Sequence, residues 1–138
     1  MSRSFDESVV VPVADAADAH ATASALEPYD VESVTVVHVV EKGEGVPDKT
    51  PVEQSEAVAA DAFEAFRETF PDAETATAYR RDVVAGIVEV AEELDASAIV
   101  FRPREGGRVV KFLSGDRSLR LLTEADRPVV ALPGEDDG

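Results

Sequence analysis

Five short apolar runs, separated by longer segments of helical pattern, constrain the fold more than any other feature of this sequence. The runs are rich in valine, isoleucine or threonine and span residues 8–13, 33–40, 75–80, 97–101 and 128–132. Near-continuous apolar runs such as Val9-Val10-Val11 are typical of strands that are covered on both faces. We therefore predict five strands, of which 75–80 is the most polar.

The segments between these runs predict helices with recognisable starts. Residues 15–26 predict the first helix. The tetrapeptide Thr50-Pro51-Val52-Glu53 forms a capping box with proline at the first helical position, so a second helix is expected to begin there. A third helix is expected after Asp82, and residues 108–125 hold helical pieces interrupted at Gly115.

Apolar spacing identifies the buried faces of the second and third helices. Residues three or four positions apart form one stripe on a helix. These residues are Ala59, Phe63, Phe66 and Phe70 in the second helix, and Val84, Ile87, Ala91 and Leu94 in the third.

Strand and helix alternation over this length predicts one α/β domain, a doubly wound parallel sheet with right-handed crossovers and helices on both faces. The domain is expected to cover residues 1–138, with 134–138 as a flexible tail.

The charge of the chain excludes several classes of partner. Aspartate and glutamate number 29 against 13 basic residues, for a net charge of −16. Such a field repels phosphate, so nucleic acid is not an expected partner. The acids are spread over all segments, and we interpret them as a surface adapted to molar salt rather than as a dedicated acidic binding face. Basic residues concentrate only between Arg102 and Arg127.

Cellular location follows from what the sequence lacks. There are no cysteines, which excludes disulfides and cysteine metal sites. The longest apolar runs, 9–14 and 34–37, are too short to span a membrane. Residues 1–7 do not form a signal peptide. We expect a cytoplasmic protein.

The order of these pieces resembles the universal stress protein family over nearly the whole chain. The resemblance rests on four segments in their order and spacing: Val9-Val10-Val11-Pro12-Val13, Val37-His38-Val39-Val40, Ile87 to Ala91 followed by Ala98-Ile99-Val100, and Arg127-Pro128-Val129-Val130-Ala131-Leu132-Pro133. It implies strand order 3-2-1-4-5, with a ligand outside the carboxyl ends of strands one and four. The expected cleft residues include Pro12, Ala14 and Val39.

In ATP-binding members of that family, a glycine-rich loop after strand four holds the phosphates. The pattern is glycine, two residues, glycine, nine residues, glycine, then serine or threonine, and it falls here on Arg102, Glu105, Gly115 and Asp116. Only Gly115 matches. The family aspartate after strand one is replaced by Ala14.

Each departure disfavours a bound triphosphate. The Arg102 side chain fills space that the family leaves to the ligand, and Glu105 adds negative charge. A carboxylate at Asp116, the expected N-cap, accepts the free helix amides itself and so competes with phosphate. The resemblance therefore implies a member that does not bind ATP and needs no cofactor; binding of ATP or AMP through an altered loop is the alternative.

The arginines around this loop have two interpretations. They could clamp a small anion by bidentate contacts. Alternatively, they pair with Glu105, Asp116 and the acidic surface. We favour this second interpretation. The arginines concerned are Arg102, Arg104, Arg108 and Arg117.

No constellation for catalysis or metal binding is present in the sequence. His38 lies in an apolar strand and is expected to be a hydrogen-bonded or partly buried structural residue; His20 is expected to be exposed. No serine sits in a glycine elbow. A phosphoacceptor receiver domain would need a lysine near Leu132, which is missing. We expect no enzyme.

The last apolar run predicts a partner. An apolar edge strand invites pairing unless it is covered. The resemblance implies a homodimer through Val129, Val130, Ala131 and Leu132, with the flanking prolines limiting its length. The sequence as a whole favours a dimeric, non-catalytic stress-response or regulatory module that binds another protein or a small anion.

Overall fold

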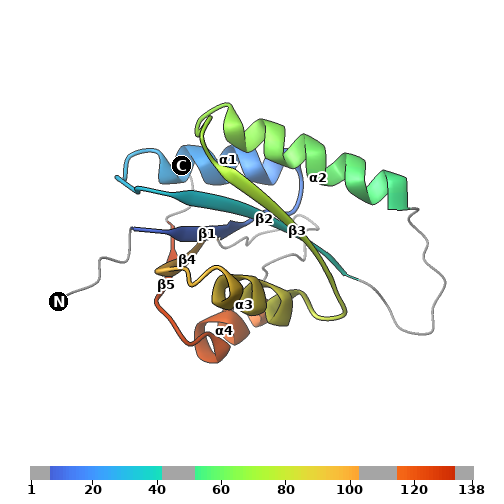
Figure 1. Cartoon of the computed structure of the whole chain (residues 1–138). Helices are drawn as coiled ribbons and strands as arrows, with labels where there is room; N and C mark the ends of the chain where they lie inside the picture. Colours follow the sequence, from blue (N-terminus) through green and yellow to red (C-terminus); the bar gives the residue numbers. More distant parts are fainter. Residues whose placement is uncertain (1–6, 42–51, 103–114, 133–138) are drawn as a thin grey trace.

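A five-stranded parallel sheet forms the centre of the chain, in a computed structural model that describes residues 7–41, 52–102 and 115–132 (Figure 1). Its strand order is β3-β2-β1-β4-β5, as the family resemblance implies, and every ladder is parallel. The strands are β1 (Val9–Pro12), β2 (Val34–Glu41), β3 (Glu74–Arg80), β4 (Ala98–Phe101) and β5 (Val129–Ala131). The fold prediction is confirmed.

Helices cover both faces of this sheet. They are α1 (Ala16–Leu26), α2 (Val52–Arg67), α3 (Val83–Glu93) and α4 (Gly115–Glu124). Figure 1 shows α1 and α2 on one face and α3 and α4 on the other. Among the described residues, none of the helices has the length and apolar character needed to cross a membrane. Residues 108–114 of the expected last helical stretch lie outside the described residues.

Two hydrophobic cores lie on either side of the sheet, because successive strand residues point to opposite faces. Val9 and Val11 of β1 belong to the core that also contains Phe66 of α2. Val10, between them, belongs to the core with Ile87 of α3. The valine run of β1 is therefore buried on both faces, which accounts for its unbroken apolar sequence.

The predicted helix stripes are correct except at one residue. In the second helix, Ala59 and Phe66 are buried, while Phe63 and Phe70 are partly buried against the core. In the third, Leu94 is 46% exposed, against expectation. The helix ends at Glu93, Leu94 is its C-cap, and the next residue, Asp95, has a positive φ of 53°. Leu94 itself is still in right-handed helical geometry, and its amide donates to Val90 at 3.0 Å. The chain leaves helical geometry at Asp95, and the buried stripe ends with Ala91.

Candidate functional site

Two aspartates accept hydrogen bonds from backbone amides just beyond the carboxyl end of β1. Asp15 caps α1, and its Oδ1 accepts a hydrogen bond from the amide of Asp18 at 2.8 Å. Asp18 Oδ2 in turn accepts from the amide of Ala14 at 2.8 Å. Asp18 is only 4% exposed, and Thr22 Oγ1 lies 3.5 Å from its Oδ1. The Ala14 amide, two residues after the end of β1, is thus already hydrogen-bonded within the chain.

The spacing of Asp15 and Asp18 is a signal for this arrangement. An acceptor at the N-cap and another three residues later is the pattern of reciprocal helix capping. The sequence analysis placed both residues in the first helix, over residues 15–26, and gave neither carboxylate a separate role. Their carboxylates instead satisfy backbone amides at the start of α1.

His38 lies beside this end of β1 as a buried structural residue. It is 8% exposed, and its Nδ1 lies 3.2 Å from the carbonyl oxygen of Val13, so Nδ1 carries the proton and donates. Burial lowers the pKa of His38, while the Val13 bond and the charge of Asp15 oppose that shift. The imidazole is therefore neutral at pH 7. The expectation for His38 is confirmed, as is the exposure of His20.

Arg102 follows the last residue of β4 and is half-buried. Its Nε atom is buried and has no hydrogen-bond partner in the described part of the chain. An unsatisfied buried donor is uncommon and costs free energy. Because β1 and β4 are neighbours, Arg102 and Ala14 follow adjacent strands at the point where the strand order reverses.

The helix after the expected phosphate loop begins two residues earlier than an N-cap at Asp116 predicts. α4 starts at Gly115, so Asp116 lies inside its first turn rather than at the N-cap. Arg117 lies in the same turn. Arg104 and Glu105 lie outside the described residues.

Two of the expected cleft residues are part of the buried interior. Pro12 is buried and pairs with Val37 of β2. Val39 is 4% exposed and packs in the core beneath α3, so close to Gly86 that a Cβ there would lie 3.1 Å from Val39 Cγ1. The Val39 side chain therefore faces α3 rather than an open site.

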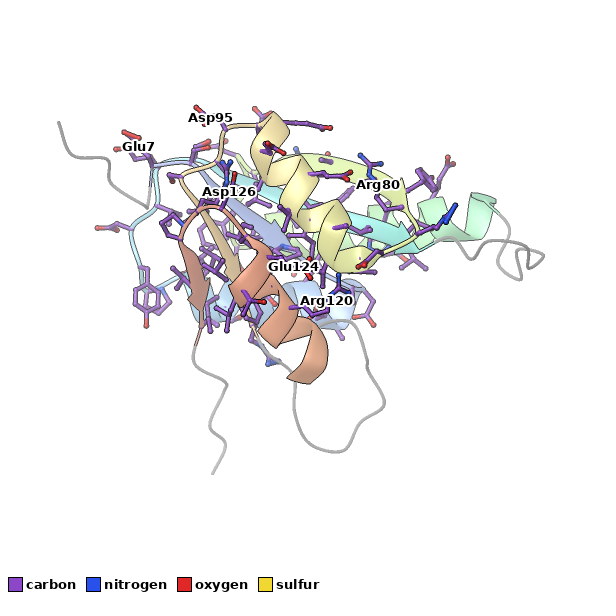
Figure 2. The ribbon with its side chains drawn as sticks, turned by 90° about the horizontal axis from the view of Figure 1, so that it is seen from below. Glu7, Arg80, Asp95, Arg120, Glu124 and Asp126 are labelled. Carbon is purple, nitrogen blue, oxygen red and sulfur yellow. The ribbon has the colours of Figure 1, made fainter. Side chains whose placement is uncertain are left out.

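A second polar cluster joins the start of α3 to the middle of α4. Asp82 caps α3 by accepting from the amides of Val84 at 3.0 Å and Ala85 at 3.3 Å. Arg120 of α4 binds the same carboxylate and also donates to Glu124 at 3.0 Å. Figure 2 labels Arg120 and Glu124 on this side of the molecule. Asp82 and Arg120 are 38 positions apart in the sequence, so sequence reasoning alone does not find this contact.

The proposed dimer strand is at one edge of the sheet. Val129 and Val130 of β5 are half-buried, and Ala131 is exposed. Leu132 is only 4% exposed and packs in the core of its own chain. Its place in a dimer interface stays a prediction.

Within the described residues, no group of three or more His, Asp or Glu side chains could hold a metal ion. A family model for the universal stress protein family matches residues 7–133. The chain belongs to the universal stress protein family.

Solved structures support the same fold. The universal stress protein from Archaeoglobus fulgidus is 23% identical, with a TM-score of 0.67 over 92% of this chain and 98% of that one. Its complex with dAMP is 22% identical, with a TM-score of 0.65 over the same shares, 92% and 98%. Universal stress protein UspA from Lactobacillus plantarum is 20% identical, with a TM-score of 0.62 over 95% of this chain and all (100%) of that one. No curated protein matches this universal stress protein in sequence.

Proposed function

We propose that this universal stress protein is a non-catalytic stress-response or regulatory module of the cytoplasm, which works as a dimeric binding module without ATP. One observation carries the proposal. Arg102 takes the place of the first loop glycine, and its buried Nε indicates that the side chain folds against the protein there. A glycine at this position would leave its space to the phosphates.

The hydrogen bonding at the end of β1 also supports the proposal that ATP is not bound. The Ala14 amide is already used by Asp18, whose buried carboxylate adds negative charge near the switch point. His38, the neighbouring ring, is neutral and supplies no compensating charge. The end of β1 therefore offers a ligand neither a free Ala14 amide nor a positive charge.

Calorimetry with ATP and AMP in molar salt tests this proposal. We expect no saturable binding by the unchanged chain. A variant that restores the family residues, with Ala14→Asp, Arg102→Gly, Glu105→Gly and Asp116→Ser, is expected to gain measurable affinity. Micromolar ATP affinity of the unchanged chain would overturn the proposal, and hydrolysis above background would overturn its non-catalytic part.

The alternative is a nucleotide-binding protein with an altered loop. It is favoured by the dAMP complex of the Archaeoglobus fulgidus relative and by the start of α4 at Gly115, the one loop position that matches. A helix start offers free amides to an anion. The same calorimetry separates the two functions, because the alternative requires AMP or ATP to bind the unchanged chain.

Dimer formation through β5 is the second part of the proposal. β5 has no strand beyond it in the described sheet, and its exposed edge residue is Ala131. Lysine at an edge position blocks strand pairing. We expect Ala131→Lys to give a monomer in sedimentation at micromolar concentration and molar salt, while Thr75→Lys on the opposite edge strand keeps the dimer. A monomeric unchanged chain would refute this part.

A further inference from the structure

A pocket lies at the edge of the sheet opposite the switch point, beside the amino ends of β2 and β3. Its volume is about 250 Å³. Its lining comes from two connections, residues 31–34 between α1 and β2 and residues 69–74 between α2 and β3. The two connections lie side by side because Thr35 pairs with Glu74 in the ladder. A pocket of this size suits a ligand smaller than a nucleotide.

One side of the pocket is apolar and packed. Val34 and Ala73 are buried, and Val31 and Phe70 are partly buried against the core. The Phe70 ring stacks on Phe66 with centroids 5.3 Å apart. The face of an aromatic ring attracts a cation. Its apolar surface can also pack against the aliphatic stem of a ligand.

The connection that carries Phe70 is held in shape by the chain itself. The carbonyl oxygen of Ala73 accepts from Arg67 Nε at 2.8 Å and from Arg67 Nη2 at 2.6 Å. The amide of Ala73 donates to Phe70, and that of Phe70 donates to Phe66, each at 3.0 Å. The pocket wall therefore needs no ligand to form, which reduces the ordering cost of binding.

Three exposed carboxylates line the pocket: Glu32, Asp72 and Glu74. None of them forms a salt bridge with a residue that the structure describes, whereas Asp82, Glu89 and Asp126 each pair with an arginine. No lysine or arginine lines the pocket. A hollow lined by one sign of charge against a low-dielectric wall concentrates its field on counter-ions.

We propose that this pocket binds a small organic cation, a guanidinium or ammonium group on an apolar stem. The charged head lies among Glu32, Asp72 and Glu74, and the stem lies against Phe70 and Val31. A bare metal ion does not fit, because no group of carboxylates in the described residues is arranged to hold one. The site is independent of the cleft between β1 and β4.

Agmatine at low ionic strength is the probe. Amide NMR signals of residues 31–34 and 69–74 are expected to shift in a saturable way, while sodium at equal ionic strength does not shift them. Each carboxylate removed is expected to weaken binding by up to about fivefold, the upper end of the effect of one exposed ion pair. The double variant Asp72→Asn with Glu74→Gln is therefore expected to bind more weakly by up to about 25-fold.

A matched variant separates a site from the general acidic surface. Asp61→Asn with Glu64→Gln removes the same charge from exposed positions on α2 and is expected to keep the affinity. Equal losses in both double variants, unsaturable shifts, or shifts spread over the whole surface would overturn the proposal. A capped tripeptide with a central arginine distinguishes the source: the same shifts indicate a cation carried by a polypeptide, and binding of agmatine alone indicates a free small molecule.

Discussion

Arg120 in α4 donates two hydrogen bonds to the carboxylate of Asp82, the residue that caps α3. Nη2 lies 2.8 Å from Oδ2, and Nη1 lies 3.2 Å from Oδ1. Asp82 Oδ1 also accepts from the first amides of α3. One carboxylate thus caps α3 and joins it to α4, the helix that follows the expected phosphate loop.

Replacing Asp82 separates these two roles. Asp82→Ala loses both and is expected to lower the free energy of unfolding by about 1–2 kcal/mol, the usual effect of a lost N-cap. Asp82→Ser keeps a capping oxygen and loses only the ion pair, so its loss is expected to be smaller, since exposed pairs contribute little. Urea denaturation measures both. Equal losses would show that capping is not the main contribution.

Acid pH is expected to remove the stability that Asp82 contributes. The hydrogen bond from Arg120 is the main reason that the pKa of the Asp82 carboxyl lies below its ordinary value of 3.8. A folded-state pKa below the unfolded one gives a contribution that is complete above about pH 4 and lost as the pH falls through the lowered value. The stability difference between the unchanged chain and Asp82→Ser should shrink over that range. A constant difference down to pH 2 would contradict the assignment.

His38 is expected to produce a second pH dependence, nearer neutrality. Because burial lowers its pKa in the folded chain, the unfolded chain binds more protons below about pH 6.5, and stability falls as the pH is lowered. The slope contributed by one such group is at most about 1.4 kcal/mol per pH unit.

Denaturation at a series of pH values between 7.5 and 5.5 tests this dependence. His38→Asn, which does not titrate, should flatten the curve in this range. The control is His20→Asn on the exposed side of α1, which should keep the slope of the unchanged chain. An unchanged slope in His38→Asn would exclude the buried imidazole as its source.

Gly86 is expected to resist the substitution that usually strengthens a helix. Alanine normally stabilises a helix interior by about 1 kcal/mol over glycine. A Cβ at Gly86, however, would lie 2.9 Å from Arg80 Cγ and 3.1 Å from Val39 Cγ1. We expect Gly86→Ala to destabilise the chain by about 1–2 kcal/mol, as overpacking does. In an Arg80→Ala background the loss should be smaller, which a double-mutant cycle measures; full additivity would refute the contact.

The strands and helix starts were predictable because their causes are local. The valine run of β1 reports burial on both faces, and the capping positions of Asp15 and Asp82 precede their helices directly. The prediction that Leu94 is buried was wrong, and the apolar spacing alone does not give the reason. Leu94 is in phase with the stripe but lies at the very end of the helix, where the chain turns away at Asp95 and leaves it 46% exposed.

The contacts and the pocket that join residues far apart in the sequence were less predictable. The position of Arg102 after β4 followed from the family pattern, but the burial of its Nε depends on packing in three dimensions. The bond between Asp82 and Arg120 joins residues 38 positions apart, and nothing in either local sequence selects the partner. The pocket beside Phe70 likewise arises from two connections that only the sheet brings together.

Salt is expected to stabilise this chain. With a net charge of −16, repulsion between carboxylates opposes folding, and molar salt shortens the range of that repulsion from about 10 Å to about 3 Å. The melting temperature should therefore rise from 0.1 M to 2 M potassium chloride. A constant or falling melting temperature would contradict the interpretation of the acids as a salt-adapted surface.

Concentrated salt also strengthens apolar burial in general, so a charge variant is needed to isolate repulsion. Glu64 lies in the last turn of α2 and Glu68 just beyond it, where a negative charge is unfavourable to the helix dipole. Glu64→Gln with Glu68→Gln should raise the melting temperature at 0.1 M salt and reduce its further rise at 2 M. If repulsion is the cause, the melting temperatures of the variant and the unchanged chain should approach each other as the salt concentration increases. A constant difference between them would assign the salt effect to apolar burial instead.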